Sequence, residues 1–325
     1  MLWPFRDEDV LHPAMDWYGC MVDSQPDATS VTGAPSSVRS SVSPKTAQVR
    51  KVTARRPIKR ATSGVKTDQE PQRDIVLTLE GLVKRFGDKT AVAGIDLEIR
   101  AGSLFGIVGP NGAGKTTTLS MITGLLRPDA GTVTVHGSNV WNSPAAAKRQ
   151  MGVLPDRLRV FDRLTGAQLL YYAGVLRGLD RKTVVSRTGD LAAAFGLEDA
   201  LERLVADYSA GMTKKISIAA AMIHSPRLLV LDEPFESVDP VSAANITEIL
   251  RRYTAAGGTV VLSSHSMDLI QRICDRVAVV VNGAVLDTGT IDEVRGSGSL
   301  EDRFVELAGG RKSAEGMEWL HSFSD

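Results

Sequence analysis

The chain has 325 residues, of which 43% are hydrophobic and 23% charged, and its 38 basic side chains balance its 38 acidic ones. This composition is that of a globular protein with one large domain or two modest ones, and a net charge of zero gives no general affinity for nucleic acid or anionic membranes. Two distant cysteines, Cys20 and Cys274, exclude a disulfide framework and suit a reducing cytosol, and no apolar run approaches the roughly 18 residues of a transmembrane helix. We therefore predict a chain that is soluble by itself.

Residues 1–73 are predicted to be a disordered basic extension rich in Ser, Thr and Pro. Between Ala28 and Lys66 there are nine Lys or Arg and no acid, and no helical or strand periodicity is sustained there. Two interpretations remain open. The segment is a tail that contacts anionic lipid or nucleic acid, or it is a solvated tail or an over-extended gene start, since Met15 and Met21 offer later starts.

Regular elements are predicted from Asp74 onward. The strands are Ile75–Glu80, Ile95–Arg100, Ser103–Val108, Thr132–His136, Gly152–Leu154, Leu228–Asp232, Thr259–Ser263 and Val277–Val281. The helices are Lys115–Leu126, Leu164–Arg177, Lys182–Phe195, Glu198–Val205, Thr213–His224, Pro240–Ala256 and Met267–Cys274, followed by a short helical tail. Strands that alternate with helices predict an α/β fold with a mainly parallel sheet covered on both faces, and the helical block at about 157–212 has the character of an insertion.

A glycine-rich loop follows the predicted strand that ends at Val108. Its residues are Gly109, Pro110, Asn111, Gly112, Ala113, Gly114, Lys115 and Thr116. They fit the pattern G-x-x-x-x-G-K-[ST], in which the glycines let backbone N–H groups point at phosphate oxygens beside the positive end of the next helix. Lys115 is suited to reach the β- and γ-phosphates, and the Thr116 hydroxyl to bind Mg²⁺. The loop predicts a nucleotide site; a glycine-rich turn with an incidental lysine is the alternative.

Two acids follow the apolar strand Leu228–Leu231. Asp232 would lie at the carboxyl edge of the sheet, where ligands of parallel sheets bind, and would hold the Mg²⁺ shell. Glu233 is then positioned to orient or deprotonate an attacking water. Two acids after a strand can also serve as a helix cap, but beside a phosphate loop we favour the catalytic role.

In this order, the motifs resemble those of the ATP-binding subunits of ATP-binding cassette (ABC) transporters, over roughly Asp74 to Ala308. Ser209 lies 23 residues before Asp232, where the family carries its signature, usually Leu-Ser-Gly-Gly-Gln. Asp239 resembles the D-loop aspartate, although it precedes a proline and also suits a helix cap, and His265 resembles the switch histidine. The chain is most similar to single-cassette subunits of drug or antibiotic exporters, and its tail Ser299–Leu307 resembles the closing helix common in that branch.

The resemblance implies ATP and Mg²⁺ as cofactors, with Glu233 and His265 as catalytic residues. Phe86 stands where the family has an aromatic side chain that stacks on adenine, and a core aromatic is its alternative role. The expected nucleotide contacts are Phe86, Gly109, Pro110, Asn111, Gly112, Ala113, Gly114, Lys115, Thr116, Thr117, Asp156, Ser209 and Gly211. The expected metal contacts are Thr116, Asp156 and Asp232.

The resemblance also implies a fold and an assembly. The fold is that of a P-loop NTPase, with a mainly parallel sheet flanked by helices, an antiparallel β subdomain and a helical insertion lobe. The ABC ATPase domain is expected at 74–310 and a C-terminal tail at 311–325. Ser209 and Gly211 would face the phosphate loop of a second subunit, so that two chains, as a homodimer or with another ABC subunit, enclose two ATP molecules.

Two motifs depart from the family pattern. The signature has Ala210 for its first glycine and Met212 for its glutamine; Ala costs little if its φ is negative, whereas Met removes a polar contact. Asp156 stands where the family has the Q-loop glutamine. It adds negative charge beside Asp232 and Glu233, and we expect hydrolysis to persist with an altered dependence on metal or an altered rate.

The resulting prediction is an ATPase that drives export through a separate transmembrane permease, from a peripheral position on the cytoplasmic face of the membrane. The alternative is a non-transport ABC ATPase that acts on ribosomes or nucleic acid. Ribosome-acting relatives usually carry two cassettes, and DNA-repair relatives carry a long coiled coil for which the 94 positions between Lys115 and Ser209 leave no room. An interaction protein with degenerate ATP binding is disfavoured because Lys115, Asp232, Glu233 and His265 are all present.

Overall fold

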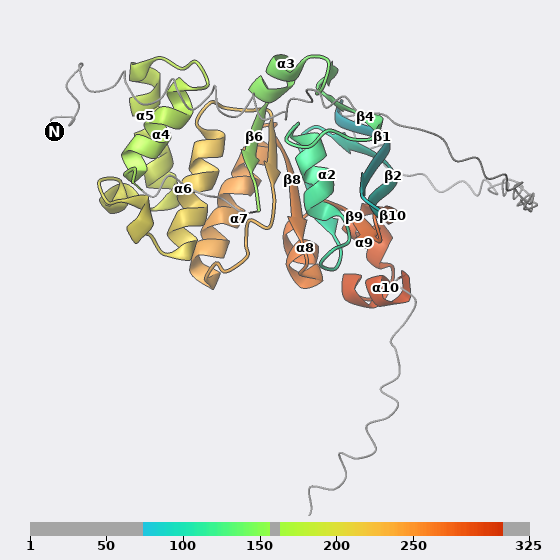
Figure 1. Cartoon of the computed structure of the whole chain (residues 1–325). Coiled ribbons are helices and arrows are strands. Elements are labelled where there is room, and N and C mark those ends of the chain that lie inside the picture. Colours follow the sequence, from blue (N-terminus) through green and yellow to red (C-terminus); the bar gives the residue numbers. More distant parts are fainter. Residues whose placement is uncertain (1–73, 157–162, 308–325) are drawn as a thin grey trace, which may run out of the picture. The chain divides into compact units, whose positions relative to one another are not determined.

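The computed structural model describes residues 74–156 and 163–307 (Figure 1). All of them lie in one of the two compact units into which the chain divides, Thr67–Asp325. The other unit, Met1–Lys66, lies outside the described residues. So do the predicted extension at 1–73 and the predicted tail at 311–325, which stay predictions.

A six-stranded sheet forms the centre of this unit. Its order is β10-β9-β3-β8-β7-β6. The strands are β3 (Leu104–Val108), β6 (Met151–Leu154), β7 (Leu228–Leu231), β8 (Thr259–Ser264), β9 (Arg276–Val281) and β10 (Ala284–Thr290). The first five run parallel to their neighbours, and β10 alone pairs antiparallel, with β9. The prediction of a mainly parallel sheet is confirmed.

The strand β10 lies between Val281 and the short helical tail, and it is missing from the sequence-based prediction. Asn282 and Gly283 both have positive φ, 50° and 78°, which is the backbone that a two-residue hairpin turn requires. The Asn-Gly pair is a strong hairpin signal, and it marks β10 in the sequence. The predicted short helical tail is present after this strand, as α9 (Ile291–Arg295) and α10 (Leu300–Leu307).

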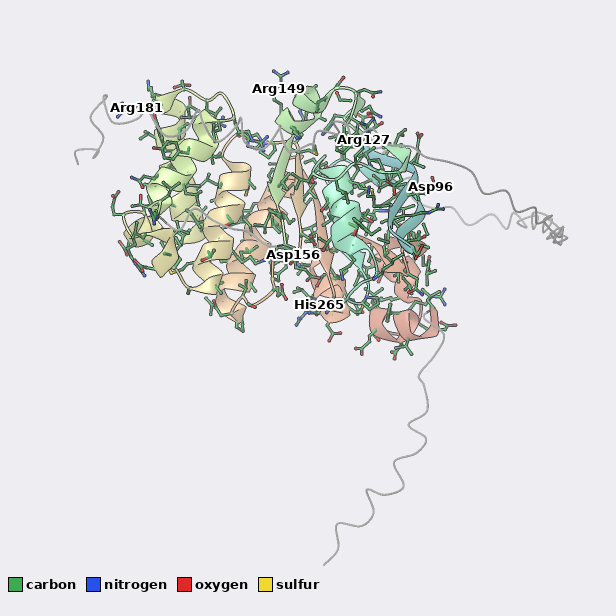
Figure 2. The ribbon with its side chains drawn as sticks, viewed as in Figure 1. Asp96, Arg127, Arg149, Asp156, Arg181 and His265 are labelled. Carbon is green, nitrogen blue, oxygen red and sulfur yellow. The ribbon has the colours of Figure 1, made fainter. Side chains whose placement is uncertain are left out.

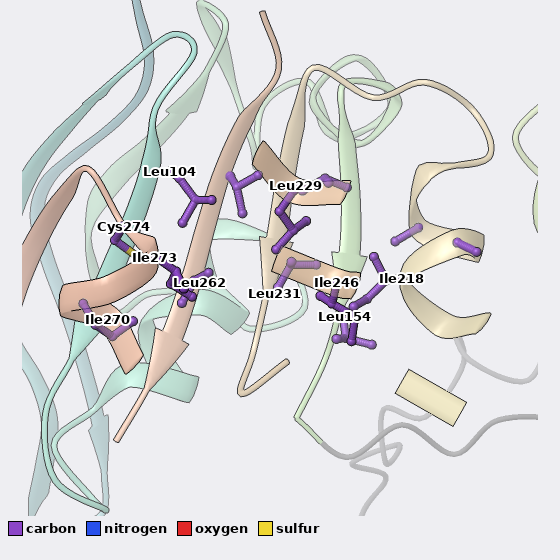
Figure 3. Close-up of a cluster of buried hydrophobic side chains, with 14 of the residues drawn as sticks. Leu104, Leu154, Ile218, Leu229, Leu231, Ile246, Leu262, Ile270, Ile273 and Cys274 are labelled. Carbon is purple, nitrogen blue, oxygen red and sulfur yellow. The ribbon is translucent and has the colours of Figure 1, made fainter. Parts of the chain in front are cut away.

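Both faces of the parallel sheet are buried, which explains why its strands are continuous apolar runs. Along β3, Leu104 and Val108 belong to one hydrophobic cluster, whereas Phe105 and Ile107 belong to another on the opposite face. Successive side chains of a strand point to opposite faces, so each strand contributes to both clusters. Figure 3 shows part of the first cluster, where strand side chains meet those of α6, α7 and α8.

The second cluster is covered by an antiparallel sheet and by α2. The order of this sheet is β2-β1-β4-β5. Its strands are β1 (Ile75–Phe86), β2 (Lys89–Arg100), β4 (Ala130–Val135) and β5 (Ser138–Asn139). The first two are long and form a hairpin that places Phe86 beside its turn. The antiparallel subdomain expected from the family resemblance is therefore present.

The remaining helices surround the sheets. They are α2 (Lys115–Ile122), α3 (Pro144–Arg149), α4 (Gly166–Val175), α5 (Arg181–Phe195), α6 (Ala210–Met222), α7 (Pro240–Ala255) and α8 (Met267–Ile273). Helices α4, α5 and α6 contact one another and form the helical lobe, green to yellow in Figure 1. Within residues 74–156 and 163–307, no helix is both long enough and apolar enough to cross a membrane.

Helix ends in the lobe follow local capping rules. The Thr165 hydroxyl oxygen accepts a hydrogen bond from the Gln168 N–H, and Gln168 Oε1 accepts one from the Thr165 N–H, which confirms the predicted capping box. The predicted helix Glu198–Val205 is wrong, because two short 3₁₀ turns, Glu198–Ala200 and Val205–Asp207, occupy that region. The predicted helix start at Thr213 is three residues late, since Ser209 caps α6 and Ala210 begins it.

Candidate nucleotide-binding site

Four parallel strands end at one edge of the six-stranded sheet, and each is followed by a predicted site residue. The glycine-rich loop follows β3, Asp156 follows β6, Asp232 and Glu233 follow β7, and His265 follows β8. Parallel strands bring their carboxyl ends together, so residues far apart in sequence converge there. Asp156 and His265 line one cavity at this edge (Figure 2).

The glycine-rich loop requires its glycines. Gly114, the residue before α2, has φ 104°, and a Cβ at this position would lie 2.4 Å from the Ala91 carbonyl oxygen. A Cβ at Gly109 would lie 2.1 Å from the Val280 carbonyl oxygen. The loop therefore curls tightly against β2 and β9 and ends at the N-terminus of α2, which is a favourable place for an anion.

Lys115, the first residue of α2, directs its ammonium group back across the loop. Its Nζ donates to the carbonyl oxygens of Gly109, at 2.9 Å, and Pro110, at 3.3 Å. The same Nζ lies 3.6 Å from Glu233 Oε1, and the Lys115 side chain is only 6% exposed. A buried cation is thus held within the loop and close to a carboxylate.

The two acids after β7 are held by β8. Asp232 accepts a short hydrogen bond from the Ser263 hydroxyl and is also hydrogen-bonded to the Thr116 side chain. Burial raises the pKa of Asp232, these two hydrogen bonds act against the rise, and the neighbouring Asp156 carboxylate adds to it. A cation bound beside Asp232 would stabilise the charged form of its carboxylate, so these surroundings suit a metal ion.

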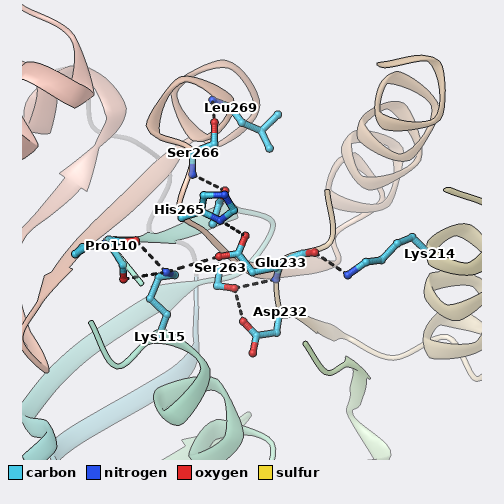
Figure 4. A network of polar contacts seen from close by, with 11 residues as sticks. Pro110, Lys115, Lys214, Asp232, Glu233, Ser263, His265, Ser266 and Leu269 are labelled. Carbon is cyan, nitrogen blue, oxygen red and sulfur yellow. Dashed lines mark hydrogen bonds and ion pairs between the residues drawn. The ribbon is translucent and has the colours of Figure 1, made fainter. Parts of the chain in front are cut away.

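Glu233 has a left-handed backbone, with φ 45°, which is uncommon for a residue with a side chain. Its N–H donates to Ser263 Oγ at 2.9 Å. Its carboxylate spans two groups, with Oε1 near Lys115 and Oε2 3.1 Å from His265 Nδ1 (Figure 4). Such backbone occurs in turns, as at Asn282, and also at functional sites, and in Glu233 it belongs to a residue of the predicted site.

A cavity of about 520 Å³ joins the loop to these acids, a size common for ligand sites. Its lining is Phe86, Lys89, Ala91, Asn111, Gly112, Gly114, Lys115, Thr116, Thr117, Asp156, Glu233, Glu236 and His265. Phe86 stands at the rim with 52% of its surface exposed, and the Lys84 ammonium lies 5.7 Å from its ring centroid. Half-exposed, Phe86 is not a core aromatic.

A second cavity of about 530 Å³ shares Thr116 and Asp156 with the first and also includes Asp232. The three predicted metal contacts therefore lie together, as one hydroxyl and two carboxylates. All are hard oxygen donors, which fit Mg²⁺. Among the described residues, this site included, no group of three or more His, Cys, Asp or Glu side chains is arranged to hold a metal ion by itself.

Ser209 and Gly211 are not in the lining of the loop cavity. Ser209 caps α6, and its Oγ accepts a hydrogen bond from the Met212 N–H at 3.3 Å. Gly211 lies inside the first turn rather than before the helix, and a Cβ there would lie 3.0 Å from Asp239 Oδ2. Ala210 is helical, so its φ is negative as the sequence required, and Met212 packs against the core.

Asp239 caps α7. Its Oδ1 accepts from the N–H groups of Val241, at 3.0 Å, and Ser242, at 2.9 Å, and these hydrogen bonds lower the pKa of Asp239. The capping role that the sequence left open is therefore present. The close approach of Gly211 brings the starts of α6 and α7 together.

Several residues at the site are missing from the sequence-based prediction, among them Lys89, Lys214, Glu236 and Ser263. Ser263 carries a readable signal, because it is a polar residue at the end of a buried strand, next to the predicted His265. Lys89 and Glu236 are common exposed residue types that only the folded geometry brings to the cavity. Lys214 donates from α6 to the Glu233 carbonyl oxygen at 2.8 Å, a contact that no local pattern indicates.

The comparisons agree with this geometry. The sequence pattern of the ABC transporter family matches residues 92–236. The daunorubicin/doxorubicin resistance ATP-binding protein DrrA of Streptomyces peucetius is 41% identical over 217 residues, which cover 67% of this chain and 66% of that protein. The linearmycin resistance ATP-binding protein LnrL of Bacillus subtilis is 35% identical and is covered to 69% of its length. The chain belongs to the ABC transporter ATP-binding proteins.

A solved structure of an ATP-binding subunit of an ABC transporter superposes with a TM-score of 0.67 at 29% identity, covering 72% of this chain and 99% of that one. The predicted family and the predicted P-loop NTPase fold are confirmed. The chain spans slightly less than two thirds of the daunorubicin relative and slightly more than two thirds of the linearmycin relative. The ABC transporter family match and the drug-resistance relatives indicate that this ABC protein is an ATPase subunit of the transporter type rather than of the non-transport type.

Proposed function

We propose that this chain binds Mg-ATP in the loop cavity and hydrolyses it as one of two subunits that drive export through a separate membrane permease. The observation that carries the proposal is the position of the Glu233 carboxylate. It lies between Lys115 and His265, from α2 and the end of β8, at the edge where ligands of parallel sheets bind.

ATP binding is supported by the loop and its surroundings. The N–H groups at the start of α2 and the Lys115 ammonium would hold the phosphates, and Thr117 lines the same cavity. Phe86 offers an exposed ring at the rim, on which adenine would stack. Lys115 would then exchange its contacts to Gly109 and Pro110 for phosphate oxygens.

Thr116, Asp232 and Asp156 would hold Mg²⁺ at the phosphates. Mg²⁺ is usually bound through one or two carboxylates together with phosphates and water, which matches this donor set. The ion would neutralise charge on the phosphate oxygens during transfer. Asp156 brings a second carboxylate to the site and raises the pKa of Asp232, so we expect it to alter the metal dependence rather than to abolish hydrolysis.

Hydrolysis would depend on Glu233 and His265. Glu233 would orient the attacking water or accept its proton, and general-base catalysis of this kind is worth about 10²–10⁴ in rate. His265, with 49% of its side chain exposed, would donate to the γ-phosphate. The contact between these two residues would hold both side chains at the reacting end of ATP.

A second subunit would complete the site. Ser209 and Gly211 lie at the start of α6, a positive helix end that lies apart from the cavity of their own chain. We expect them to face the ATP bound by a partner, in a homodimer or beside another ABC subunit. Two composite sites would then form, and hydrolysis would release the pair.

The cargo class follows from the relatives. Two of them are named as ATP-binding proteins for resistance to daunorubicin and doxorubicin or to linearmycin. We therefore propose a drug or antibiotic as the exported molecule. The ATPase would sit at the cytoplasmic face of the membrane, attached to its permease.

The test is Glu233→Gln in Mg-ATP. This variant keeps the shape of the side chain but loses the base, so turnover should fall on the order of 10²–10⁴-fold while ATP stays bound. Bound ATP should shift the variant from monomer to dimer in size-exclusion chromatography, and ADP should not. Glu236→Gln, which alters an acid of the same cavity for which no ion pair with Lys115 or His265 is seen, is the matched control. A variant that stays monomeric in ATP would contradict the sandwich arrangement.

A further inference from the structure

Lys214 makes a contact that the proposed chemistry does not use. It lies in the second turn of α6 and extends its ammonium group to the Glu233 carbonyl oxygen, with an N–O distance of 2.8 Å (Figure 4). It does not line the loop cavity, so we do not expect it to contact ATP in its own chain. The contact instead joins α6, the helix that begins with the signature residues, to the backbone of Glu233, the expected general base.

Nearby carboxylates favour the charged form of the Lys214 side chain. Burial lowers the pKa of Lys214, and four carboxylates act in the opposite direction, those of Glu236, Asp156, Asp232 and Glu233. A half-buried ammonium group among four acids offsets negative charge that Mg²⁺ and Lys115 must otherwise balance. Its hydrogen-bonded partner is nevertheless a backbone carbonyl rather than one of these acids.

That carbonyl belongs to the strained residue of the site. A non-glycine residue with φ 45° costs on the order of 1–3 kcal/mol and persists only when its neighbours fix it. Ser263 fixes the Glu233 N–H from β8. On the other side, the Glu233 carbonyl oxygen accepts from Lys214 and, at 3.3 Å, from the Glu236 N–H. Lys214 is the contribution of α6 to this arrangement.

We propose that Lys214 is a positioning residue for Glu233. It fixes the peptide whose conformation aims the carboxylate between Lys115 and His265, and it ties that peptide to the helix capped by Ser209. Lys214 is five positions after Ser209, which is about 7.5 Å along the helix axis. Because that end of α6 is expected to meet the ATP of a partner, Lys214 would link a partner's nucleotide to the general base of its own chain. This inference rests on the proposed ATPase function.

The experiment compares Lys214→Met, Lys214→Gln and Lys214→Arg with a matched control, Lys182→Met. Lys182 is an exposed helical lysine in the lobe, with no contact to the site. In Lys214→Met we expect kcat to fall on the order of 10- to 100-fold, since small displacements of a catalytic group cost that much, with KM for ATP changed less than about 2-fold. Lys214→Arg keeps the charge and the donor and should recover most of the loss, and Lys182→Met should behave as the wild type.

A double-mutant cycle separates positioning from general damage. If Lys214 acts through Glu233, Lys214→Met should change the single-turnover rate by less than about 2-fold in a Glu233→Ala background. Equal losses in both backgrounds, a wild-type kcat in Lys214→Met, or parallel losses of ATP affinity and melting temperature in Lys214→Met and Lys214→Gln would overturn the proposal. If the wild type hydrolyses ATP and any of these results is found, the positioning role is refuted and the proposed ATPase function is not. A wild type that binds no ATP refutes the ATPase function as well.

Discussion

Polar groups have different surroundings at the carboxyl edge of the six-stranded sheet and in the helical lobe. At the edge, Asp232 is buried with a raised pKa, Glu233 holds a left-handed backbone, and Lys115 is a buried cation. In the lobe, Thr165 and Ser209 cap helices, and each satisfies an N–H group of its own helix.

The difference separates chemistry from support. Desolvated charges and strained backbone cost stability, so they persist where a ligand or a reaction uses them. Caps stabilise the helices that carry them. The start of α6 combines both kinds of role. Ser209 stabilises its own helix as a cap, and Gly211 lies close to Asp239 at the start of α7, in the segment that follows Asp232 and Glu233. Variants at the edge should therefore change ATP binding or turnover, and variants in the lobe should change stability.

Among the variants that compare the edge with the lobe, the largest effect is expected from Lys115→Ala. Removing a buried cation that would pair with phosphate should weaken ATP binding by roughly 100-fold, as for other truncated buried charge pairs. Fluorescence titration with a labelled ATP analogue measures this change, and circular dichroism shows whether the fold persists. Lys182→Met provides the control in the lobe. Comparable weakening by the control would break the separation between edge and lobe.

A smaller effect on the lobe side is expected from His224→Gln. Burial lowers the pKa of His224 to about 4, against an ordinary value of 6.5, while its Nε2 contacts the Met151 carbonyl oxygen at 3.0 Å. Between these pH values the unfolded chain binds more protons than the folded chain, so stability falls as pH decreases from about 6.5 towards 4. With allowance for partial exposure, His224 should account for about 1–2 kcal/mol of that loss.

Urea unfolding at pH 7 and pH 4.5 measures this contribution. The wild type should lose more unfolding free energy than His224→Gln over this range, and the variant should bind ATP like the wild type at pH 7. Identical losses in the two proteins would show that His224 does not carry the pH dependence. Weakened ATP binding would place this part of the lobe in the site.

The smallest effect is expected from Asp156→Gln. This change removes one carboxylate near Asp232 and should bring the pKa of Asp232 closer to its ordinary value. The Mg²⁺ concentration for half-maximal turnover should rise by roughly 2- to 5-fold, because an exposed or half-buried carboxylate contributes up to about 1 kcal/mol to cation binding. Turnover measured against Mg²⁺ concentration checks this. If neither the metal dependence nor the rate changes, Asp156 does not tune the site.

Local patterns predict the edge well. The strand before Gly109, the strand before Asp232 and the polar pair at Ser264 and His265 are all contiguous signals, so the sequence identifies them without any knowledge of packing. The parallel topology then brings them together. The antiparallel strand β10 could also have been predicted from the sequence, since two adjacent residues, Asn282 and Gly283, form its hairpin turn.

Contacts between distant elements could not be predicted in the same way. The reach of Lys214 to the Glu233 carbonyl depends on how α6 packs beside β7, and nothing local to Lys214 encodes it. The start of α6 was misplaced for a different reason. Ser209 and Gly211 are typical of turns, but Ser209 is a cap and Gly211 is a helical residue for which the adjacent Asp239 leaves little room.

The most direct test of the shared site compares Glu233→Gln with Glu233→Gln/Ser209→Arg by analytical ultracentrifugation in Mg-ATP. A large cation at the start of α6 should block the partner while leaving the loop cavity of its own chain intact. The account predicts an ATP-dependent dimer for the single variant, and a monomer with unchanged ATP affinity for the double variant. A double variant that still dimerises in ATP, or that loses its ATP affinity as a monomer, would contradict the assignment of Ser209 to the partner's site.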